Sequence, residues 1–222
     1  MGIIRRILLL FSGFNWLAIP AALLAIIFHE FSHGYVASLL GDNTAKAKGR
    51  LSLNPAKHLD VLGLICMIFF GFGWAKPVPV NPYFFKDKKL GMILVSLAGP
   101  LSNIIMAFVS LFAGVALSRV SVENGTLPYL IMVLIEFFLY FSVFNVGLAV
   151  FNFLPIPPLD GSKILFSLLP PSAYGFILKY ERYGMLILLI LINLPFFSVF
   201  LNNVRMLVFS GIETVIYSIL FG

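Results

Sequence analysis

The chain has 222 residues, of which 60% are hydrophobic and only 11% are charged. A soluble domain has about 45–50% apolar and about 25% charged residues, so this composition excludes an ordinary soluble protein and indicates a polytopic membrane protein. The net charge of +6 does not indicate a nucleic-acid partner, because the basic residues fall in short loops between apolar segments. The length suits one domain over residues 1–222, and the single cysteine, Cys66, excludes an internal disulfide.

The N-terminal residues 3–15 are apolar but too short to cross a bilayer, since a crossing needs about 20 residues. Arg5 and Arg6 at their start resemble the beginning of a signal peptide. No small-residue cleavage site follows, so we expect the segment to be retained as an interfacial lead-in. A spanning helix is predicted at residues 16–40, with Pro20 near its start and a glycine just after its end.

This helix carries the motif His29-Glu30-Phe31-Ser32-His33. Residues four apart share a helix face, so His29 and His33 can bind one ion. Glu30 occupies the position in which zinc proteases keep a carboxylate beside the metal-bound water. A membrane histidine can instead serve packing or capping, but two histidines and a glutamate are costly in hydrocarbon. We therefore predict a metal site within the bilayer.

Three stretches after this helix lack a long helical pattern. In residues 43–58 polar and apolar residues alternate around a central glycine. This pattern predicts a short hairpin or strand pair at the membrane surface. Residues 59–74 are apolar, short and glycine-rich, and they form either a short crossing or a re-entrant segment. Residues 75–82 contain spaced prolines, so they form an extended edge strand or a surface loop rather than a helix.

The remaining apolar stretches predict four helices, at residues 90–117, 127–153, 183–200 and 204–221. Pro195 interrupts the third of these, and the fourth either spans the membrane or lies along its surface. In the first, Asn103 is predicted to hydrogen-bond across a helix interface, in a packing rather than a catalytic role. Three prolines at residues 155–158 end the second helix and turn the backbone.

A catalytic zinc site usually has three protein ligands and one open position for water. Asp160 stands on an irregular segment just beyond a spanning helix, where a backbone break is tolerated only if it lines protein or water. This makes Asp160 the best candidate for the third ligand. The other candidates are less suitable. His58 lies in a surface stretch, Glu136 lies near the middle of its span, and Glu123 and Glu213 have little near them to suggest a site.

For Asp160 to meet His33, their two helices must end on the same side of the membrane, which requires residues 59–74 to re-enter. The loops that then share this side are residues 41–58, 75–89 and 161–182. Of the 15 basic residues, most fall in these loops: Lys46, Lys48, Arg50, Lys57, Lys76, Lys86, Lys88, Lys89, Lys163, Lys179 and Arg182. The positive-inside rule makes this side cytoplasmic. We predict a multi-pass protein of the cell membrane whose active site lies nearer the cytoplasmic side.

The chain resembles the site-2 proteases, a family of intramembrane zinc metalloproteases. The resemblance rests on the HExxH motif in a membrane helix and on the downstream segment Asn-Phe-Leu-Pro-Ile-Pro-Pro-Leu-Asp-Gly at residues 152–161. Lesser matches lie at residues 49–55, 73–82 and 98–103. The family often carries PDZ or CBS domains; the resemblance here is to a compact form without them.

The resemblance implies Zn²⁺ as the cofactor, with His29, His33 and Asp160 as its ligands and Glu30 as the general base. It also implies that Asn152 holds the substrate or its developing oxyanion. The alternative for Asn152 is that its amide closes the broken end of its helix. The implied fold is an all-α helix bundle with a re-entrant or extended membrane-surface segment and a metal site within the bilayer.

The implied reaction is zinc-dependent cleavage of transmembrane segments in membrane-protein substrates, within the lipid bilayer. A transmembrane helix must unwind before its peptide bonds can be attacked, and its freed backbone groups then need partners. Val78-Pro79-Val80 or residues 50–53 could offer an edge to which the unwound substrate adds as a strand, or both could be simple surface connections. The rival functions are a transporter or ion-binding protein, with Glu136 as its buried carboxylate, and an inactive relative that only binds helices. No nucleic-acid partner is expected, and a homo-oligomer remains open.

Overall fold

A computed structural model describes residues 16–63, 75–123, 129–170 and 183–221. Within these ranges the regular elements are helices, and the expected all-α helix bundle is confirmed. The longer helices are α2 (Ala18–Leu39), α5 (Lys88–Glu123), α6 (Tyr129–Asn152) and α10 (Pro195–Phe221). The shorter ones are α3 (Thr44–Ala47), η1 (Pro55–Lys57), η2 (Pro82–Phe84), α7 (Asp160–Leu168) and α9 (Gly184–Ile192).

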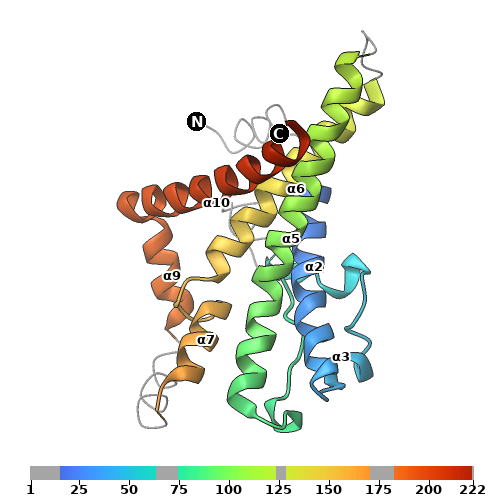
Figure 1. Cartoon of the computed structure of the whole chain (residues 1–222). Helices are drawn as coiled ribbons and strands as arrows, with labels where there is room; N and C mark the ends of the chain where they lie inside the picture. The colour runs from blue at the N-terminus through green and yellow to red at the C-terminus, as the bar shows by residue number, and fades with distance from the viewer. Residues whose placement is uncertain (1–15, 64–74, 124–128, 171–182, 222) are drawn as a thin grey trace, which may run out of the picture.

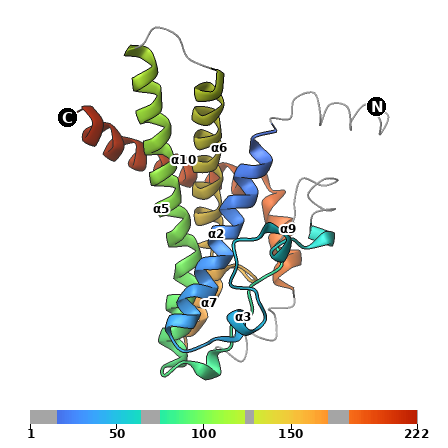
Figure 2. The same ribbon diagram turned by 90° about the vertical axis from the view of Figure 1, so that its right-hand side faces the viewer.

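Helices α2, α5 and α6 pack side by side and form the centre of the molecule (Figures 1 and 2). Small residues on α2 allow this close approach, since Ala21 and Ala25 are fully buried against Phe141 of α6. The helices predicted at residues 16–40, 90–117 and 127–153 are thus confirmed, although α5 extends beyond residues 90–117 at both ends. By length and composition, four helical stretches among the described residues could cross a membrane: Ala18–Leu39, Lys88–Arg119, Tyr129–Asn152 and Pro195–Phe221.

The strand pair predicted at residues 43–58 is wrong. The short helices α3 and η1 occupy this stretch instead. Side chains bind the backbone locally here: the Asp42 carboxylate accepts the Thr44 N–H at 2.9 Å, and the Asn54 side chain accepts the Ala56 N–H at 3.0 Å. Such bonds satisfy the first N–H groups of a helical turn and compete with strand pairing.

The two ends of the segment at residues 59–74 lie next to each other. Leu59 and Ala75 form an isolated antiparallel bridge, and the Lys76 N–H donates to the His58 carbonyl at 2.8 Å. This agrees with a re-entrant segment, whose residues 64–74 lie outside the described part of the chain. Residues 76–81 then continue as an extended stretch without helix or strand, so the predicted absence of a helix is confirmed, but Val78 within the stretch is buried rather than at the surface.

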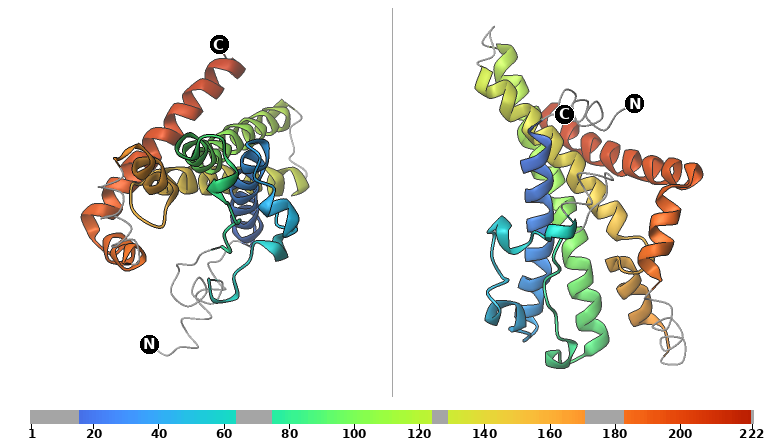
Figure 3. Two further views of the ribbon diagram at one scale, coloured as in Figure 1. Left: turned by 90° about the horizontal axis from the view of Figure 1, so that it is seen from below. Right: turned by 180° about the vertical axis from the view of Figure 1, so that it is seen from behind.

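The C-terminal part differs from the sequence prediction. The predicted span at residues 183–200 is wrong, because α9 has only nine residues and ends before Pro195. Pro195 begins α10 rather than interrupting a helix, a position where its missing N–H is not needed. The predicted helix at 204–221 is therefore the C-terminal two thirds of α10, which crosses α5 and α6 at a large angle (Figures 1 and 3).

Candidate metal centre

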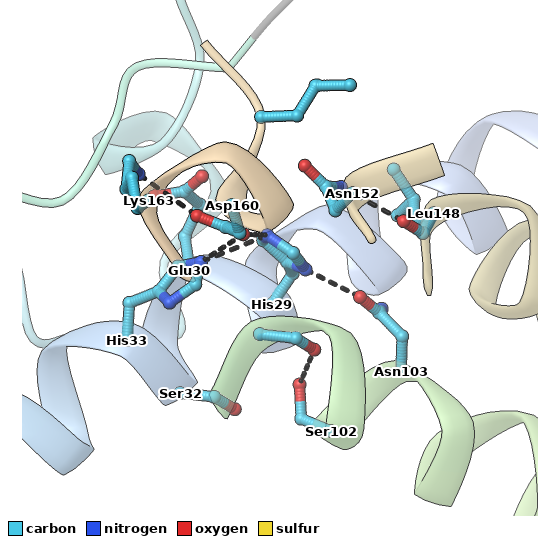
Figure 4. Close-up of polar contacts among 12 residues, drawn as sticks. His29, Glu30, Ser32, His33, Ser102, Asn103, Leu148, Asn152, Asp160 and Lys163 are labelled. Atoms are coloured by element: carbon cyan, nitrogen blue, oxygen red, sulfur yellow. Dashed lines mark hydrogen bonds and ion pairs between the residues drawn. The ribbon is translucent and has the colours of Figure 1, made fainter. Parts of the chain in front are cut away.

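Two helices bring three buried donor side chains to one point. His29 and His33 stand one turn apart on α2, and Asp160 is the first residue of α7. The Asp160 Oδ2 atom lies 3.1 Å from Nε2 of His29 and 3.0 Å from Nε2 of His33. One ligand atom from each residue lies within 4.8 Å of the other two, so the group could hold a metal ion. Figure 4 shows both imidazole rings facing the Asp160 carboxylate.

Hydrogen bonds from α5 fix the orientation of both rings. The Nδ1 atom of His29 lies 2.6 Å from Oδ1 of Asn103, and Nδ1 of His33 lies 2.7 Å from the Val95 carbonyl oxygen. Because both partners are acceptors, each Nδ1 donates its proton and each Nε2 keeps a lone pair for a metal. The donor set and its outer hydrogen bonds therefore fit a zinc ion.

Asn103 is fully buried and connects three helices. Its Nδ2 group donates to Oδ1 of Asn145 on α6 at 2.7 Å and to the Ala25 carbonyl on α2 at 3.2 Å. The predicted hydrogen bond across a helix interface is thus present. The same amide orients His29, a role that was not predicted; an amide in a span near the depth of the motif is the signal that could have indicated it.

Gly99 of α5 lies directly beneath the two imidazole rings. A Cβ atom at this position would stand 2.5 Å from Nε2 of His33 and 2.6 Å from Cε1 of His29. A real Cβ atom does not approach other atoms this closely. The absence of a side chain at Gly99 is therefore what allows α5 to pack against the histidines.

The segment between α6 and α7 positions Asp160. The prolines after Asn152 end α6, as predicted, and the chain turns so that Asp160 starts a new helix. A side chain at Gly161 would collide with the Phe153 carbonyl, so this turn is tight. The other carboxylate oxygen, Oδ1, lies 3.0 Å from Nζ of Lys163, which is about half exposed. Lys163 was predicted only as a surface residue, and its contact with Asp160 was not predicted.

Glu30 and Asn152 lie beside the donor group. The Glu30 Oε2 atom accepts the backbone N–H of Val78 at 2.8 Å. The Asn152 Nδ2 group donates to the Leu148 carbonyl at 3.0 Å, which is the local backbone contact that we considered as an alternative role. Among the described residues, His58 stands apart from the group, and its Nε2 lies 2.6 Å from the Ser52 carbonyl oxygen.

A cavity of about 560 Å³ opens onto the donor group. Its walls come from α2, from the end of α6 and from the extended segment that includes Val78 and Val80. Glu30, Asn152 and Lys163 also line it. The Ser96 hydroxyl is buried at this cavity without a hydrogen-bond partner in the described part of the chain.

Comparison with known proteins adds to this geometry. The model of peptidase family M50 matches residues 120–192. A Bacillus subtilis protein named as a zinc metalloprotease, YwhC, is 45% identical over 167 residues, which cover 75% of each chain. The chain belongs to peptidase family M50. The zinc metalloprotease name is also carried by two similar proteins: Rip2 of Mycolicibacterium smegmatis, 29% identical over 83% of this chain and 70% of its own, and MJ0611 of Methanocaldococcus jannaschii, 34% identical over 70% and 74%. No solved structure matches the chain.

Membership in family M50 confirms the resemblance to the site-2 proteases and identifies a membrane-embedded metalloprotease. The zinc cofactor expected of this M50 peptidase agrees with the names of its relatives and with a donor group that could hold a metal. The expected multi-pass membrane protein is confirmed by its apolar helices together with the family.

Proposed function

We propose that this M50 peptidase is an intramembrane endopeptidase that cleaves transmembrane segments of membrane-protein substrates. The observation that carries the proposal is the cavity that holds Glu30 beside the His29, His33 and Asp160 group, among helices apolar enough to span. These three residues would hold the zinc ion. When bound, zinc polarises a peptide carbonyl and lowers the pKa of a coordinated water.

Glu30 is the general base in this proposal. Its Oε2 atom is bonded to the Val78 N–H, while Oε1 has no hydrogen bond with the described residues and is available to water. The carboxylate accepts a proton from the water that attacks the scissile carbonyl carbon. It then returns this proton to the amine nitrogen as the carbon–nitrogen bond breaks.

Asn152 is proposed to stabilise the developing oxyanion or to hold the substrate. Its amide nitrogen has two hydrogens, of which one is donated to the Leu148 carbonyl. The second hydrogen can be donated to a substrate oxygen at the cavity that Asn152 lines. The local contact with Leu148 then orients the amide instead of competing with its role.

The segment Val78-Pro79-Val80 is proposed to bind the unwound substrate as an added strand. In an extended chain the N–H and C=O groups of residues 78 and 80 point to the same side, and the Val78 N–H points at Glu30. The Val78 carbonyl and the Val80 N–H make no hydrogen bond within the described part of the chain. These free groups beside the base are what a substrate strand would pair with.

The test of the proposed function is cleavage of a single-pass reporter helix by the purified protein in liposomes. We expect cleavage that a chelator abolishes and that added zinc restores. An intact reporter under all conditions would favour an inactive, helix-binding relative, and metal uptake without cleavage would favour a transporter.

Unwinding of the substrate is tested with the same reporter. Asn-Gly at the cleavage depth weakens a helix, so replacing this pair by Leu-Leu should slow cleavage without changing membrane insertion. Equal cleavage of both reporters would contradict the strand-addition model.

We further propose that the protein lies in the cell membrane and that its active site opens toward the cytoplasm. The clustering of the basic loops on one side supports this orientation.

A further inference from the structure

A second hollow, of about 240 Å³, lies between α6 and α10. Apart from one arginine its lining is apolar, with aliphatic and aromatic side chains such as Val143, Phe144 and Leu201. Arg205 of α10 is the charged residue among those that line it. This hollow, which we call the Arg205 groove, has no role in the reaction proposed above.

Arg205 has no partner within the described part of the chain. Its guanidinium lies against Gly147, where a Cβ atom would stand 3.6 Å from Nη2 and 3.7 Å from Nε. It makes no hydrogen bond or ion pair with a described residue. By contrast, Arg119 donates to the Leu220 carbonyl and stacks on Phe221.

The position of Arg205 in the bundle makes an unpaired charge costly. Lys88 and Arg119 stand at opposite ends of α5, about 46 Å apart along its axis, which is close to the full thickness of a bilayer. Helix α10 packs on α5 at Ala107, about 28 Å from Lys88 and about 18 Å from Arg119. The same cluster contains Val146, which precedes Gly147, so the guanidinium lies at the depth of the hydrocarbon. A cation at this depth is retained when it has a partner or a function.

The Arg205 groove adjoins the cavity at the metal donor group, since the two hollows share lining residues on α6. Leu148 and Phe151 line both hollows. Along α6, Gly147 and Asn152 are five residues apart, about 8 Å of helix. A substrate segment that reaches the cavity along α6 therefore passes the Arg205 guanidinium.

We propose that Arg205 binds the carboxylate of an Asp or Glu in the transmembrane segment of the substrate. The inference rests on the proposed function and adds a specificity residue to it. A guanidinium pairs with a carboxylate through two parallel hydrogen bonds, and the pair neutralises both charges within the bilayer. A phospholipid phosphate has the same charge chemistry but belongs at the membrane surface, whereas Arg205 lies far from both basic ends of α5.

The test uses single-pass reporter helices with Asn-Gly at the cleavage depth, in liposomes of neutral lipid. One series carries a single Asp at successive positions on either side of this pair, and a matched series carries Asn at the same positions. We expect wild-type protein to cleave Asp reporters roughly ten-fold faster at positions about 8 Å from the scissile bond, which is five helical or two to three extended residues. Equal rates at every position would overturn the inference, while failure to cleave either series would reject the proposed function itself.

Charge variants separate recognition by Arg205 from a merely structural role. Arg205→Glu should reverse the preference, so that Lys reporters are cleaved faster than Asp reporters. The double variant Arg205→Gln, Asn203→Arg keeps the net charge and moves the cation to an exposed position on α10; the Asp preference should then disappear. A preference that persists in this variant would overturn the inference. A lipid-binding role for Arg205 would also overturn the inference. It would be shown if anionic phospholipid raised the melting temperature of wild type but not of Arg205→Gln, while Asp reporters were cleaved no faster than Asn reporters.

Discussion

At the scale of single residues, the candidate metal centre depends on partners from a helix other than the one that carries the motif. The spacing of His29 and His33 puts two rings on one face of α2, but α5 decides which nitrogen each ring presents. Outer hydrogen bonds of this kind orient metal-binding histidines and raise their basicity. The Asp160 carboxylate is also oriented by an outer contact, since Lys163 binds its Oδ1 atom and leaves Oδ2 facing the rings. Substitutions of this outer set should therefore change metal binding without removing a donor.

The first prediction separates the base from the proposed ligands. Glu30→Gln should keep zinc and lose cleavage by roughly 100-fold or more, because it removes a general base and spares the donors. His29→Ala, His33→Ala and Asp160→Ala should lose both zinc and cleavage. Metal analysis of the purified variants, together with reporter cleavage, checks this. A zinc-free Glu30→Gln protein or a fully loaded Asp160→Ala protein would contradict the assigned roles.

The second prediction concerns Gly99. Gly99→Ala places a methyl group where the His29 and His33 rings now lie, so the rings must move and zinc affinity should fall by at least about ten-fold. The matched control is Gly114→Ala on the same helix, because a Cβ there makes only an ordinary 3.4 Å contact with Phe138. Zinc titration of both proteins measures the difference. Equal affinities would show that α5 can withdraw from the rings.

At the scale of elements, the extended segment after residue 75 is held between α2 and the loop that follows it. The Val78 N–H binds Glu30, the Asn81 N–H binds Oδ2 of Asp42 at 2.6 Å, and Arg50 donates to the Lys76 carbonyl at 2.7 Å. These contacts attach the segment at three points along its length. Asp42 is the member of this set whose contribution can be measured by pH.

The third prediction uses the titration of Asp42. Burial alone would raise the pKa of this carboxyl, but hydrogen bonds from the Asn81 and Thr44 backbone N–H groups outweigh it and hold the pKa below its usual range. A carboxyl whose pKa is lowered by folding adds stability above its unfolded pKa and loses it as the pH falls through the lower folded value. Asp42→Asn should therefore lower the free energy of unfolding by about 1–3 kcal/mol at pH 7.

Unfolding in detergent at several pH values checks this prediction. The difference between wild type and Asp42→Asn should shrink as the pH falls below about 3.9, because wild type then protonates its own carboxyl. A difference that stays constant at pH values well below this one would mean that the carboxylate charge contributes nothing to the fold.

At the scale of the whole molecule, the described parts of the basic loops gather at one end of the bundle. The start of α5, α3 and α7 all lie at the lower end of the molecule in Figure 1, and Nζ of Lys89 lies 3.4 Å from the Leu169 carbonyl. The donor group lies further inside, because Gly99, which contacts both histidines, is about 16 Å along α5 from Lys88. A site at this depth needs a water path from the basic end of the bundle, and the basic residue Lys163 lines the cavity at the donor group.

The fourth prediction is the orientation of the protein. In a Cys66→Ser background, cysteines at Lys48 and Lys88 should be labelled from the cytoplasm and a cysteine at Glu123 from the opposite side. Impermeant maleimide on intact cells and on inverted vesicles measures this. Labelling of positions 48 and 88 from opposite sides would conflict with the bridge between Leu59 and Ala75, and the grouping of Asp160 with the histidines would need another explanation.

The main features of the protein follow from local patterns in its sequence. Apolar runs determine where α2, α5 and α6 form, because a helix in hydrocarbon satisfies its own backbone groups. The HExxH spacing determines that His29 and His33 share a face, and the prolines after Asn152 determine that α6 ends before Asp160. These are properties of neighbouring residues, so they can be predicted without knowledge of the packing.

The tertiary structure decided the features that depend on residues far apart in the chain. The partners of the two rings, Asn103 and the Val95 carbonyl, are 74 and 62 residues away from them. The strand pair expected at residues 43–58 failed because Asp42 and Asn54 bind the local backbone, and the C-terminal helix boundary shifted because Pro195 starts α10. Local periodicity records only which face of a helix is apolar. Which side chain that face meets is decided when the helices pack, and this is why the close approach at Gly99 and the contact of Lys163 with Asp160 were found only in the structure.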